Sequence, residues 1–230
     1  DTPLLPLPPS AVAALVVGAL GLAVTGRHCF IDTTTGEPGE MEVLGQALAK
    51  HGAVYIEANV AGSSALAKRG EATLFLGGSA ETINRCRPIL EALAAKRFHV
   101  GPVGAASRFK LVHNLILGLN RAALAEGLAF AEALGFDAND ALAILRETPA
   151  TSSALEAKGK NMANCDFDPP QARLSQHLKD VRLIRKLAGE SGAGTPLSET
   201  HQTLLERAEA LGLGESDNAA EIEALRRRNL

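Results

Sequence analysis

The chain has 230 residues, of which 46% are hydrophobic and 21% are charged, and its formal net charge is -3 at pH 7. This composition is typical of a globular protein and excludes a disordered chain. The slightly acidic balance excludes the general attraction for nucleic acid or anionic lipid that a basic protein has. Three cysteines without a CxxC pair, Cys29, Cys86 and Cys165, indicate neither a disulfide framework nor a metal site, and they favour a reducing, cytoplasmic compartment.

The first part of the chain contains an apolar run from Ala11 to Val24. The run is shorter than the roughly 18 residues that a membrane span needs. Prolines and Asp1 precede it instead of a basic segment, so a signal peptide is not expected. We predict a short strand at Leu4–Pro8 and a buried helix from Ser10 to Leu22.

Strand and helix patterns alternate from His28 to Gly104. Strands are predicted at residues 28–32, 53–62, 72–78 and 97–101, helices at about 41–51 and 81–96, and a loop at 63–70. This alternation predicts a sheet with helices packed on its faces.

Strand patterns stop after Gly104. Residues 111–135 are apolar nearly all round, which predicts a long helix that is buried on several sides and ends at Gly135. Three more helices are predicted: one capped by Asp137 or Asn139, one at about 175–188 with an apolar stripe, and one at about 196–211. A capping box of Asn218 and Glu221 would begin a final helix. The second half is therefore expected to be all-helical.

The stretch Gly101–Asn114, GPVGAASRFKLVHN, carries the first candidate residues. Lys110 and Asn114 are four residues apart and would share one helix face. Their ammonium and carboxamide groups could then act on the same small oxygenated molecule. Apolar neighbours would desolvate Lys110 and make it an acid or base near neutral pH. From composition alone, a lysine that merely extends from a buried helix to solvent is an equally good interpretation.

Two predicted strands end in polar turns. Thr33, Thr34 and Thr35 offer hydroxyls and backbone amides at the carboxyl end of a strand, where ligands bind in open α/β sheets. The turn of Gly62, Ser63 and Ser64 follows another strand and could bind a carboxylate. The three threonines could equally be a helix-capping segment.

The predicted helix at about 175–188 carries a second group of charged candidates. Asp180 faces an apolar side of this helix, so we expect it to be half-buried and to need a partner. Lys179 belongs to a basic flank that could meet an anion, although for Arg182 and Lys186 a solvated face is the preferred interpretation. His113, beside the Lys110 pair, is interpreted as structural.

The motifs IDTTTGEP, EANVAGSS with AxxGEATLFLGG, GPVGAASRFKLVHN and HLKD follow one another along the chain. Their order resembles that of the β-hydroxyacid dehydrogenase family, which includes 3-hydroxyisobutyrate dehydrogenases and glyoxylate or succinic semialdehyde reductases. The resemblance implies a partial Rossmann-like, NAD(P)-binding α/β domain at residues 1–103, followed by an all-α substrate and dimerisation domain at 104–230, built on the long central helix. The implied activity interconverts a small 2- or 3-hydroxy acid and its carbonyl or semialdehyde form.

The same resemblance implies roles for the candidate residues. Lys110 would be the catalytic lysine, which protonates the carbonyl oxygen in reduction and takes the hydroxyl proton in oxidation. Asn114 would hold the same oxygen or the substrate carboxylate, and Asp180 would lie near the active site. The segment 62–64 would bind the substrate carboxylate.

Cofactor binding is where the sequence departs from the family. Thr35 and Lys179 match positions that contact NAD or NADP. Family members begin with a strand, a GxGxxG turn and a helix that bind the pyrophosphate, and this sequence has no GxGxxG. We therefore expect the first βαβ portion to be missing. The alternative function is a non-catalytic assembly protein, or an inactive fragment, that has lost cofactor binding. A homodimer or higher homo-oligomer is expected in either case.

Overall fold

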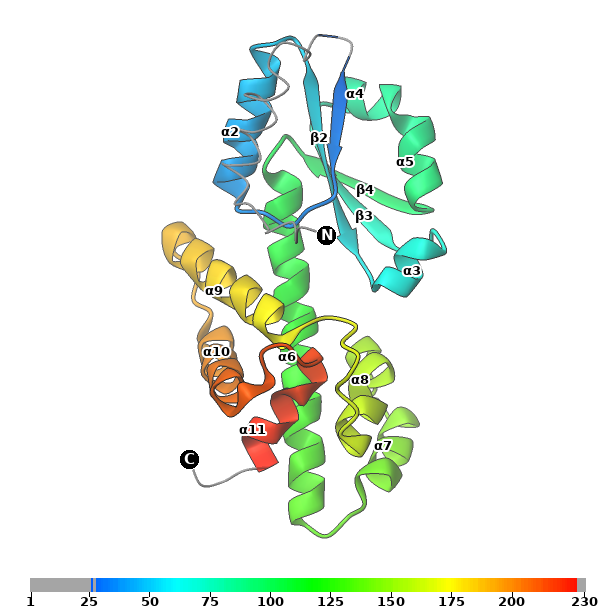
Figure 1. Ribbon diagram of the computed structural model, residues 1–230, viewed down its shortest axis with the longest axis vertical. Coiled ribbons are helices and arrows are strands. Elements are labelled where there is room, and N and C mark those ends of the chain that lie inside the picture. The colour runs from blue at the N-terminus through cyan, green and yellow to red at the C-terminus, as the bar shows by residue number, and fades with distance from the viewer. Residues whose placement is uncertain (1–25, 27, 227–230) are drawn as a thin grey trace, which may run out of the picture. The chain divides into compact units, whose positions relative to one another are not determined.

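The computed structural model describes residue 26 and residues 28–226 (Figure 1). The strand predicted at Leu4–Pro8 and the helix predicted from Ser10 to Leu22 lie outside the described residues. The chain forms two compact units, of which the first ends at Lys110 and the second begins at Leu111. None of the described helices is long and apolar enough to cross a membrane.

The first unit contains a four-stranded sheet in the order β1-β2-β3-β4. Its strands are β1 (Cys29–Asp32), β2 (Val54–Ala61), β3 (Thr73–Gly77) and β4 (Lys96–Gly101). β1 pairs with β2, and β3 with β4, in parallel, whereas β2 and β3 are antiparallel. All four predicted strands from His28 onward are therefore present, in a mixed sheet.

Helices cover both faces of this sheet. They are α2 (Pro38–Ala49), α3 (Ser64–Lys68), α4 (Ala80–Arg85) and α5 (Arg87–Leu93). Figure 1 shows α2 on one side of the sheet and α4 with α5 on the other. The loop predicted at residues 63–70 is wrong, because this segment contains α3. Its first turn is stabilised by Ser63, whose Oγ accepts a hydrogen bond from the backbone N–H of Leu66.

The single helix predicted at residues 81–96 is also wrong. It is divided into α4 and α5 at Cys86, and residue 96 already belongs to β4. The division has a local cause, because Pro88 lies in the first turn of α5. A proline lacks the backbone N–H and its ring disfavours a continuous helix through the preceding turn.

Alternate residues of β2 enter two different apolar cores. Ile56 and Ala58 pack with Leu90 on the side of α4 and α5. Tyr55 packs with Met41 on the side of α2. Successive side chains of a strand point to opposite faces of the sheet. The pattern therefore places β2 between two helical layers, as the predicted α/β arrangement requires.

Glu57 of β2 binds the beginning of α6 (Ala105–Ala133). The side chain is 1% exposed. Its carboxylate accepts hydrogen bonds from the backbone N–H of Gly104 and from both the N–H and the hydroxyl of Ser107. A carboxylate at this position satisfies otherwise unpaired N–H groups and interacts favourably with the helix dipole. Glu57 thus fixes the first turn of the helix that carries Lys110.

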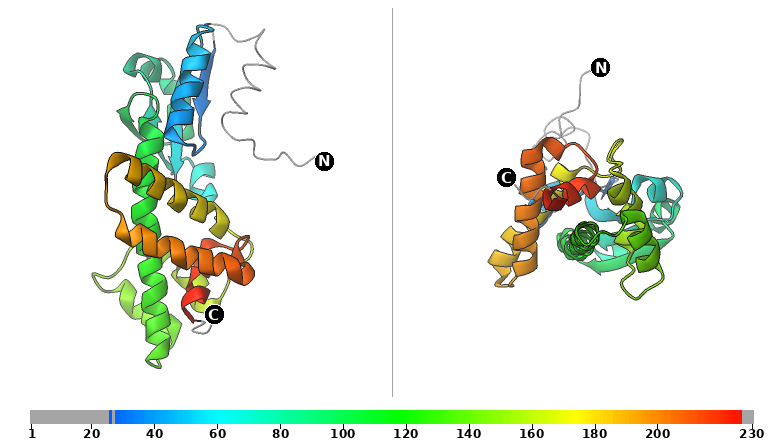
Figure 2. Two further views of the ribbon diagram at one scale, coloured as in Figure 1. Left: turned by 90° about the vertical axis from the view of Figure 1, so that its left-hand side faces the viewer. Right: turned by 90° about the horizontal axis from the view of Figure 1, so that it is seen from below.

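The second unit is all-helical, as predicted. After α6 it contains α7 (Ala138–Arg146), α8 (Ser153–Asn164), α9 (Leu174–Ser191), α10 (Pro196–Ala208), a π-helical turn at Glu209–Leu213, a 3-10 helix at Asn218–Ile222 and α11 (Glu223–Arg226). The view along α6 in Figure 2 shows α7 and α8 on one side of this helix and α9 and α10 on the other. The sequence analysis missed α8.

The central helix is less buried than predicted. Val112, Ile116 and Phe130 of α6 are 52%, 55% and 63% exposed. The prediction that α6 is buried on several sides is therefore wrong for a single copy of the protein. The neighbouring helices of the second unit cover only part of its circumference (Figure 2), and these three apolar side chains remain uncovered.

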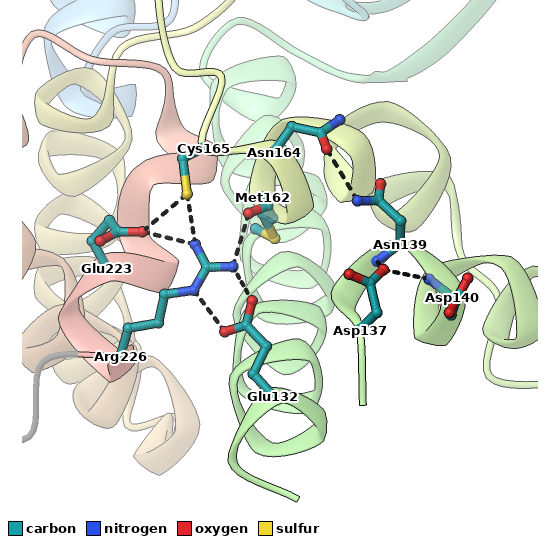
Figure 3. A network of polar contacts seen from close by, with 9 residues as sticks. All are labelled: Glu132, Asp137, Asn139, Asp140, Met162, Asn164, Cys165, Glu223 and Arg226. Carbon is teal, nitrogen blue, oxygen red and sulfur yellow. Dashed lines mark hydrogen bonds and ion pairs between the residues drawn. The ribbon is translucent and has the colours of Figure 1, made fainter. Parts of the chain in front are cut away.

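Local interactions fix the end of α6 and the start of α7. Asp137 caps α7 and accepts hydrogen bonds from the backbone N–H groups of Asn139 and Asp140 (Figure 3). Arg226 of α11 donates from Nε to Glu132 of α6 at 2.8 Å (Figure 3). Gly135 ends α6 with a φ of 89°, which glycine adopts more readily than other residues.

The capping box predicted for Asn218 and Glu221 is wrong. Asp217 is the capping residue, and its side chain accepts a hydrogen bond from the backbone N–H of Ala219. Glu221 is fully buried instead and accepts from Arg121 Nε at 2.9 Å. The Glu221 carboxylate thus binds a buried guanidinium instead of a backbone N–H group at the start of the helix.

Two histidines lie beside this buried ion pair. His201 Nε2 is 3.0 Å from Glu221, and its ring centroid is 5.2 Å from that of His177. A Cβ atom on Gly118 would come within 2.6 Å of His177 Nε2, so any larger residue there would displace the imidazole ring. Burial, together with the nearby charge of Arg121 and the electrostatic effect of His201, lowers the pKa of His177 well below its ordinary value.

The depressed pKa of His177 predicts a loss of stability in acid. The unfolded chain binds a proton at this residue below about pH 6.5 and the folded chain does not. Between about pH 7.5 and 5.5 the free energy of unfolding should therefore fall by about 1.4 kcal/mol more than in a His177→Leu variant. Urea unfolding at both pH values measures this, with His51→Leu, at an exposed site, as the control. Equal losses in the parent and in His177→Leu would contradict the prediction.

Candidate active site

Lys110 lies in the second turn of α6 and is 8% exposed. Next to it, Phe109 packs edge-on against Phe75, with ring centroids 4.8 Å apart. An ammonium group in such surroundings is poorly hydrated, which favours proton transfer. Lys110 is thus buried, as its apolar neighbours predicted, and its catalytic role stays a prediction.

Asn114 follows one helical turn later, and both the nitrogen and the oxygen of its side-chain amide contact other side chains. Its Nδ2 donates to Asp180 Oδ2 at 3.0 Å. Its Oδ1 is 3.1 Å from His113 Nδ1, and because an amide oxygen only accepts, Nδ1 of His113 must carry a proton. Asp180 therefore has the partner that the sequence analysis expected, and His113 contacts the amide of Asn114, which is consistent with its interpretation as a structural residue.

Lys179, beside Asp180 in α9, is exposed. One turn further, Arg182 forms an ion pair with Glu206 at 3.1 Å in which both partners are about half-exposed. This pairing agrees with the solvated face predicted for Arg182. The assignment of Lys179 to cofactor contact stays a prediction.

The turn after β1 is built by side chains that the sequence analysis did not single out. Asp32 accepts hydrogen bonds from the N–H of Thr34 at 2.8 Å and from its hydroxyl at 2.7 Å. Asn59 donates to the carbonyl of Thr34. Thr34 is therefore committed to the turn. Thr35 is half-buried, and its hydroxyl makes no hydrogen bond with any residue that the structure describes.

Tyr55 supports the same turn from the middle of the first unit. Its hydroxyl donates to Asp32 Oδ2 at 2.7 Å. Burial and this contact raise the pKa of Tyr55 far above its ordinary value, so the phenol stays protonated and continues to donate. Tyr55 and Asn59 could have been recognised from the sequence, because with Glu57 they are the polar side chains of the mainly apolar strand β2.

The turn after β2 contains the predicted carboxylate-binding residues. Gly62 has a φ of 147°, and Ser63 is half-buried. Ser63 Oγ accepts the 3.3 Å hydrogen bond from Leu66 that caps α3. Its own hydroxyl proton remains able to donate to a carboxylate. The side chain of Ser64 lies outside the described part of the structure.

Two family models match successive parts of this chain. Residues 104–225 match a family model described as the NAD-binding domain of NADP-dependent 3-hydroxyisobutyrate dehydrogenase. Residues 8–101 match the NAD-binding domain of 6-phosphogluconate dehydrogenase. The chain belongs to the β-hydroxyacid dehydrogenase family. Both models are NAD-binding domains, so NAD or NADP is the cofactor of this oxidoreductase family, as the resemblance implied.

Individual relatives include enzymes and a nuclear factor. The chain is 28% identical over 197 residues to glyoxylate/succinic semialdehyde reductase 1 of Arabidopsis thaliana, covering 86% of this chain and 68% of that protein. It is 29% identical over 203 residues to the cytokine-like nuclear factor N-PAC of Drosophila melanogaster, covering 88% of this chain but only 34% of N-PAC. The chain thus spans about a third of this larger relative.

A solved structure confirms the predicted fold class. The 3-hydroxyisobutyrate dehydrogenase of Mycobacterium tuberculosis, determined with L-serine, has a TM-score of 0.83 to this chain at 26% identity. The match covers 96% of this chain and 78% of that one. The Rossmann-like α/β domain followed by a helical domain is therefore the family fold.

Proposed function

We propose that the chain is an NAD(P)-dependent oxidoreductase that interconverts a small 2- or 3-hydroxy acid and its carbonyl or semialdehyde form. The observation that carries this proposal is Lys110, 8% exposed and one turn before Asn114 on α6. Membership of the family supports the reaction class. L-serine, present in the Mycobacterium tuberculosis structure, is itself a small 3-hydroxy acid, which supports the substrate class.

Proton transfer is the task of the protein in this reaction. The nicotinamide cofactor supplies or accepts the hydride. In reduction, the Lys110 ammonium donates a proton to the carbonyl oxygen, and in oxidation the neutral amine takes the hydroxyl proton. Asn114, whose amide is fixed by His113 and Asp180, holds the same oxygen or the carboxylate. The Ser63 hydroxyl donates a hydrogen bond to the substrate carboxylate.

The residues of the first unit fit the nicotinamide end of the cofactor. Thr35 lies at the carboxyl end of β1 in a turn that Asp32 and Asn59 hold in place, and its hydroxyl can bind a polar group of the cofactor. Lys179 belongs to the second unit, and its cofactor contact rests on the family resemblance alone. The sequence contains no GxGxxG, so we propose a contact to the nicotinamide end only and none to the phosphates.

A matched pair of aldehydes tests the proposed substrate class. The chain is incubated with NADPH or NADH and either methylmalonate semialdehyde, whose reduction gives the 3-hydroxy acid 3-hydroxyisobutyrate, or 2-methylpropanal, which has a methyl group in place of the carboxylate. We expect oxidation of the cofactor with the semialdehyde and little with 2-methylpropanal, because the proposed role of Ser63 and Asn114 is to bind the carboxylate. Equal rates with both would contradict the hydroxy-acid specificity, and no oxidation with either, nor with glyoxylate, would contradict the enzyme function.

A second candidate function is a non-catalytic assembly or interaction role. The similarity to N-PAC, named as a nuclear factor, favours it. An assembly protein would keep its oligomeric state and partners when Lys110 is replaced, whereas the enzyme would lose turnover. The cytoplasmic compartment expected from the sequence stays a prediction.

A homodimer or higher homo-oligomer is part of the proposal. The exposed side chains of Val112, Ile116 and Phe130 on α6 need cover that their own unit does not supply. We expect sedimentation equilibrium at micromolar concentration to show a dimer or larger species, and Ile116→Glu to weaken it. A monomer at these concentrations would contradict the prediction.

A further inference from the structure

Two cysteines of the first unit lie side by side although 57 residues separate them. The Sγ atoms of Cys29 and Cys86 are 2.9 Å apart, and both cysteines are free. A disulfide bond has a length of about 2.05 Å, so the two sulfur atoms need to approach by only about 0.9 Å. Few backbone adjustments are needed for so small a movement.

The pair joins the strand β1 to the break between α4 and α5. Cys29 is the first residue of β1, a strand of four residues that pairs with β2 and forms one end of the strand order. Cys86 lies at the break between α4 and α5 and is 5% exposed. Both side chains belong to the apolar core on the α4 and α5 face. A bond between them would tie an end strand to a helix break.

We propose that Cys29 and Cys86 form a thiol–disulfide couple, which a small-molecule disulfide such as oxidised glutathione converts to an intramolecular disulfide. This modification would attach β1 covalently to the start of α5. It extends the sequence analysis, which found no disulfide framework, because a single reversible bond between close thiols needs no such framework.

The disulfide forms in two successive thiol–disulfide exchange reactions. The Cys29 thiol, the more accessible one, loses its proton, and its thiolate attacks one sulfur of oxidised glutathione. A Cys29–glutathione mixed disulfide forms and one glutathione thiolate leaves. Cys86 then loses its proton and attacks the Cys29 sulfur, which releases the second glutathione. The two cysteines are oxidised by two electrons, the glutathione disulfide is reduced to two thiols, and the two protons end on those thiols.

The surroundings of Cys29 control how fast this happens. Burial and the neighbouring Cys86 raise the pKa of Cys29 to about 11, although Arg85 acts in the opposite direction. Little thiolate is therefore present near neutral pH, and only the thiolate attacks a disulfide. Oxidation should be slow at pH 7. Its rate should increase about tenfold for each unit by which the pH is raised, as long as the pH stays below this pKa.

The experiment uses the full chain with the third cysteine removed. Cys165 lies in the second unit, where its sulfur is 3.2 Å from Arg226 Nη1 (Figure 3), and Cys165→Ser leaves only the pair. This variant is equilibrated with excess oxidised glutathione at about pH 8.5, and its thiols, intact mass and thermal unfolding are measured. The matched controls add Cys29→Ser or Cys86→Ser to the same background.

We expect the Cys165→Ser chain to lose both thiols and two hydrogen atoms of mass, without bound glutathione. Its unfolding midpoint should rise by roughly 5–15 °C and return after reduction. Each control should show at most a mixed disulfide and no such rise. Two thiols that still titrate in the native chain, or a bond between two chains, would overturn the proposal.

Discussion

Replacing Lys110 with methionine should lower kcat/KM by about 100- to 10,000-fold, the usual contribution of a general acid or base. Methionine keeps an unbranched apolar side chain at this site, which is 8% exposed, and removes only the proton-transferring group. The unbranched methionine side chain can fill the same space, so we expect the variant to remain folded. The measurement is steady-state kinetics with methylmalonate semialdehyde, together with urea unfolding of the same samples.

Lys160→Met is the matched control for Lys110→Met. Lys160 is an exposed lysine near the end of α8, so its replacement should change neither kinetics nor stability by a measurable amount. Undiminished turnover in Lys110→Met would contradict the proposed mechanism. If Lys110→Met lost both turnover and folding, this would contradict the proposal that Lys110 acts in catalysis and is not needed for the fold.

Replacing Glu221 with leucine should lower the free energy of unfolding by about 3–5 kcal/mol. Glu221 is fully buried and contacts both Arg121 and His201. Arg121 is only 4% exposed, and its Nη2 is already without a hydrogen-bond partner among the described residues. Removing the carboxylate would leave a buried guanidinium uncompensated, which costs more than the ion pair itself contributes.

A double variant separates the pair from the packing around it. Arg121→Met with Glu221→Leu removes both charges and should regain most of the stability that Glu221→Leu alone loses, because apolar side chains replace a buried ion pair at little cost. Urea unfolding of both single variants and the double variant measures this coupling. A loss below about 1 kcal/mol in Glu221→Leu, or additive effects in the double variant, would contradict the account.

The strands were predictable because each is a short apolar run between turn residues. The apolar stripe of α9 was predictable for a similar reason, since Leu174, Leu178 and Val181 repeat at helical spacing and are all buried. The helix α8 gave no such signal. Its buried positions include Lys158 and Gly159, so its apolar stripe is too weak to stand out. Tertiary packing stabilises α8 more than its own pattern does.

The candidate site shows the same limit at single residues. A half-buried Asp180 could be expected to need a partner, but a sequence does not say that the partner is Asn114, 66 residues away. Glu57 and Glu221 were not recognised as buried carboxylates, because their partners come from distant elements. What can be read locally is the residue type and its face, whereas pairings across the fold depend on tertiary structure.

The central claim is that this chain uses a nicotinamide cofactor, and a calorimetric titration of the chain with NADPH and then NADH tests it most directly. The account predicts saturable binding of at least one cofactor with a Kd below about 0.1 mM, or more than roughly 5 kcal/mol. Absence of binding heat with both cofactors, at several temperatures and with folded protein, would contradict it.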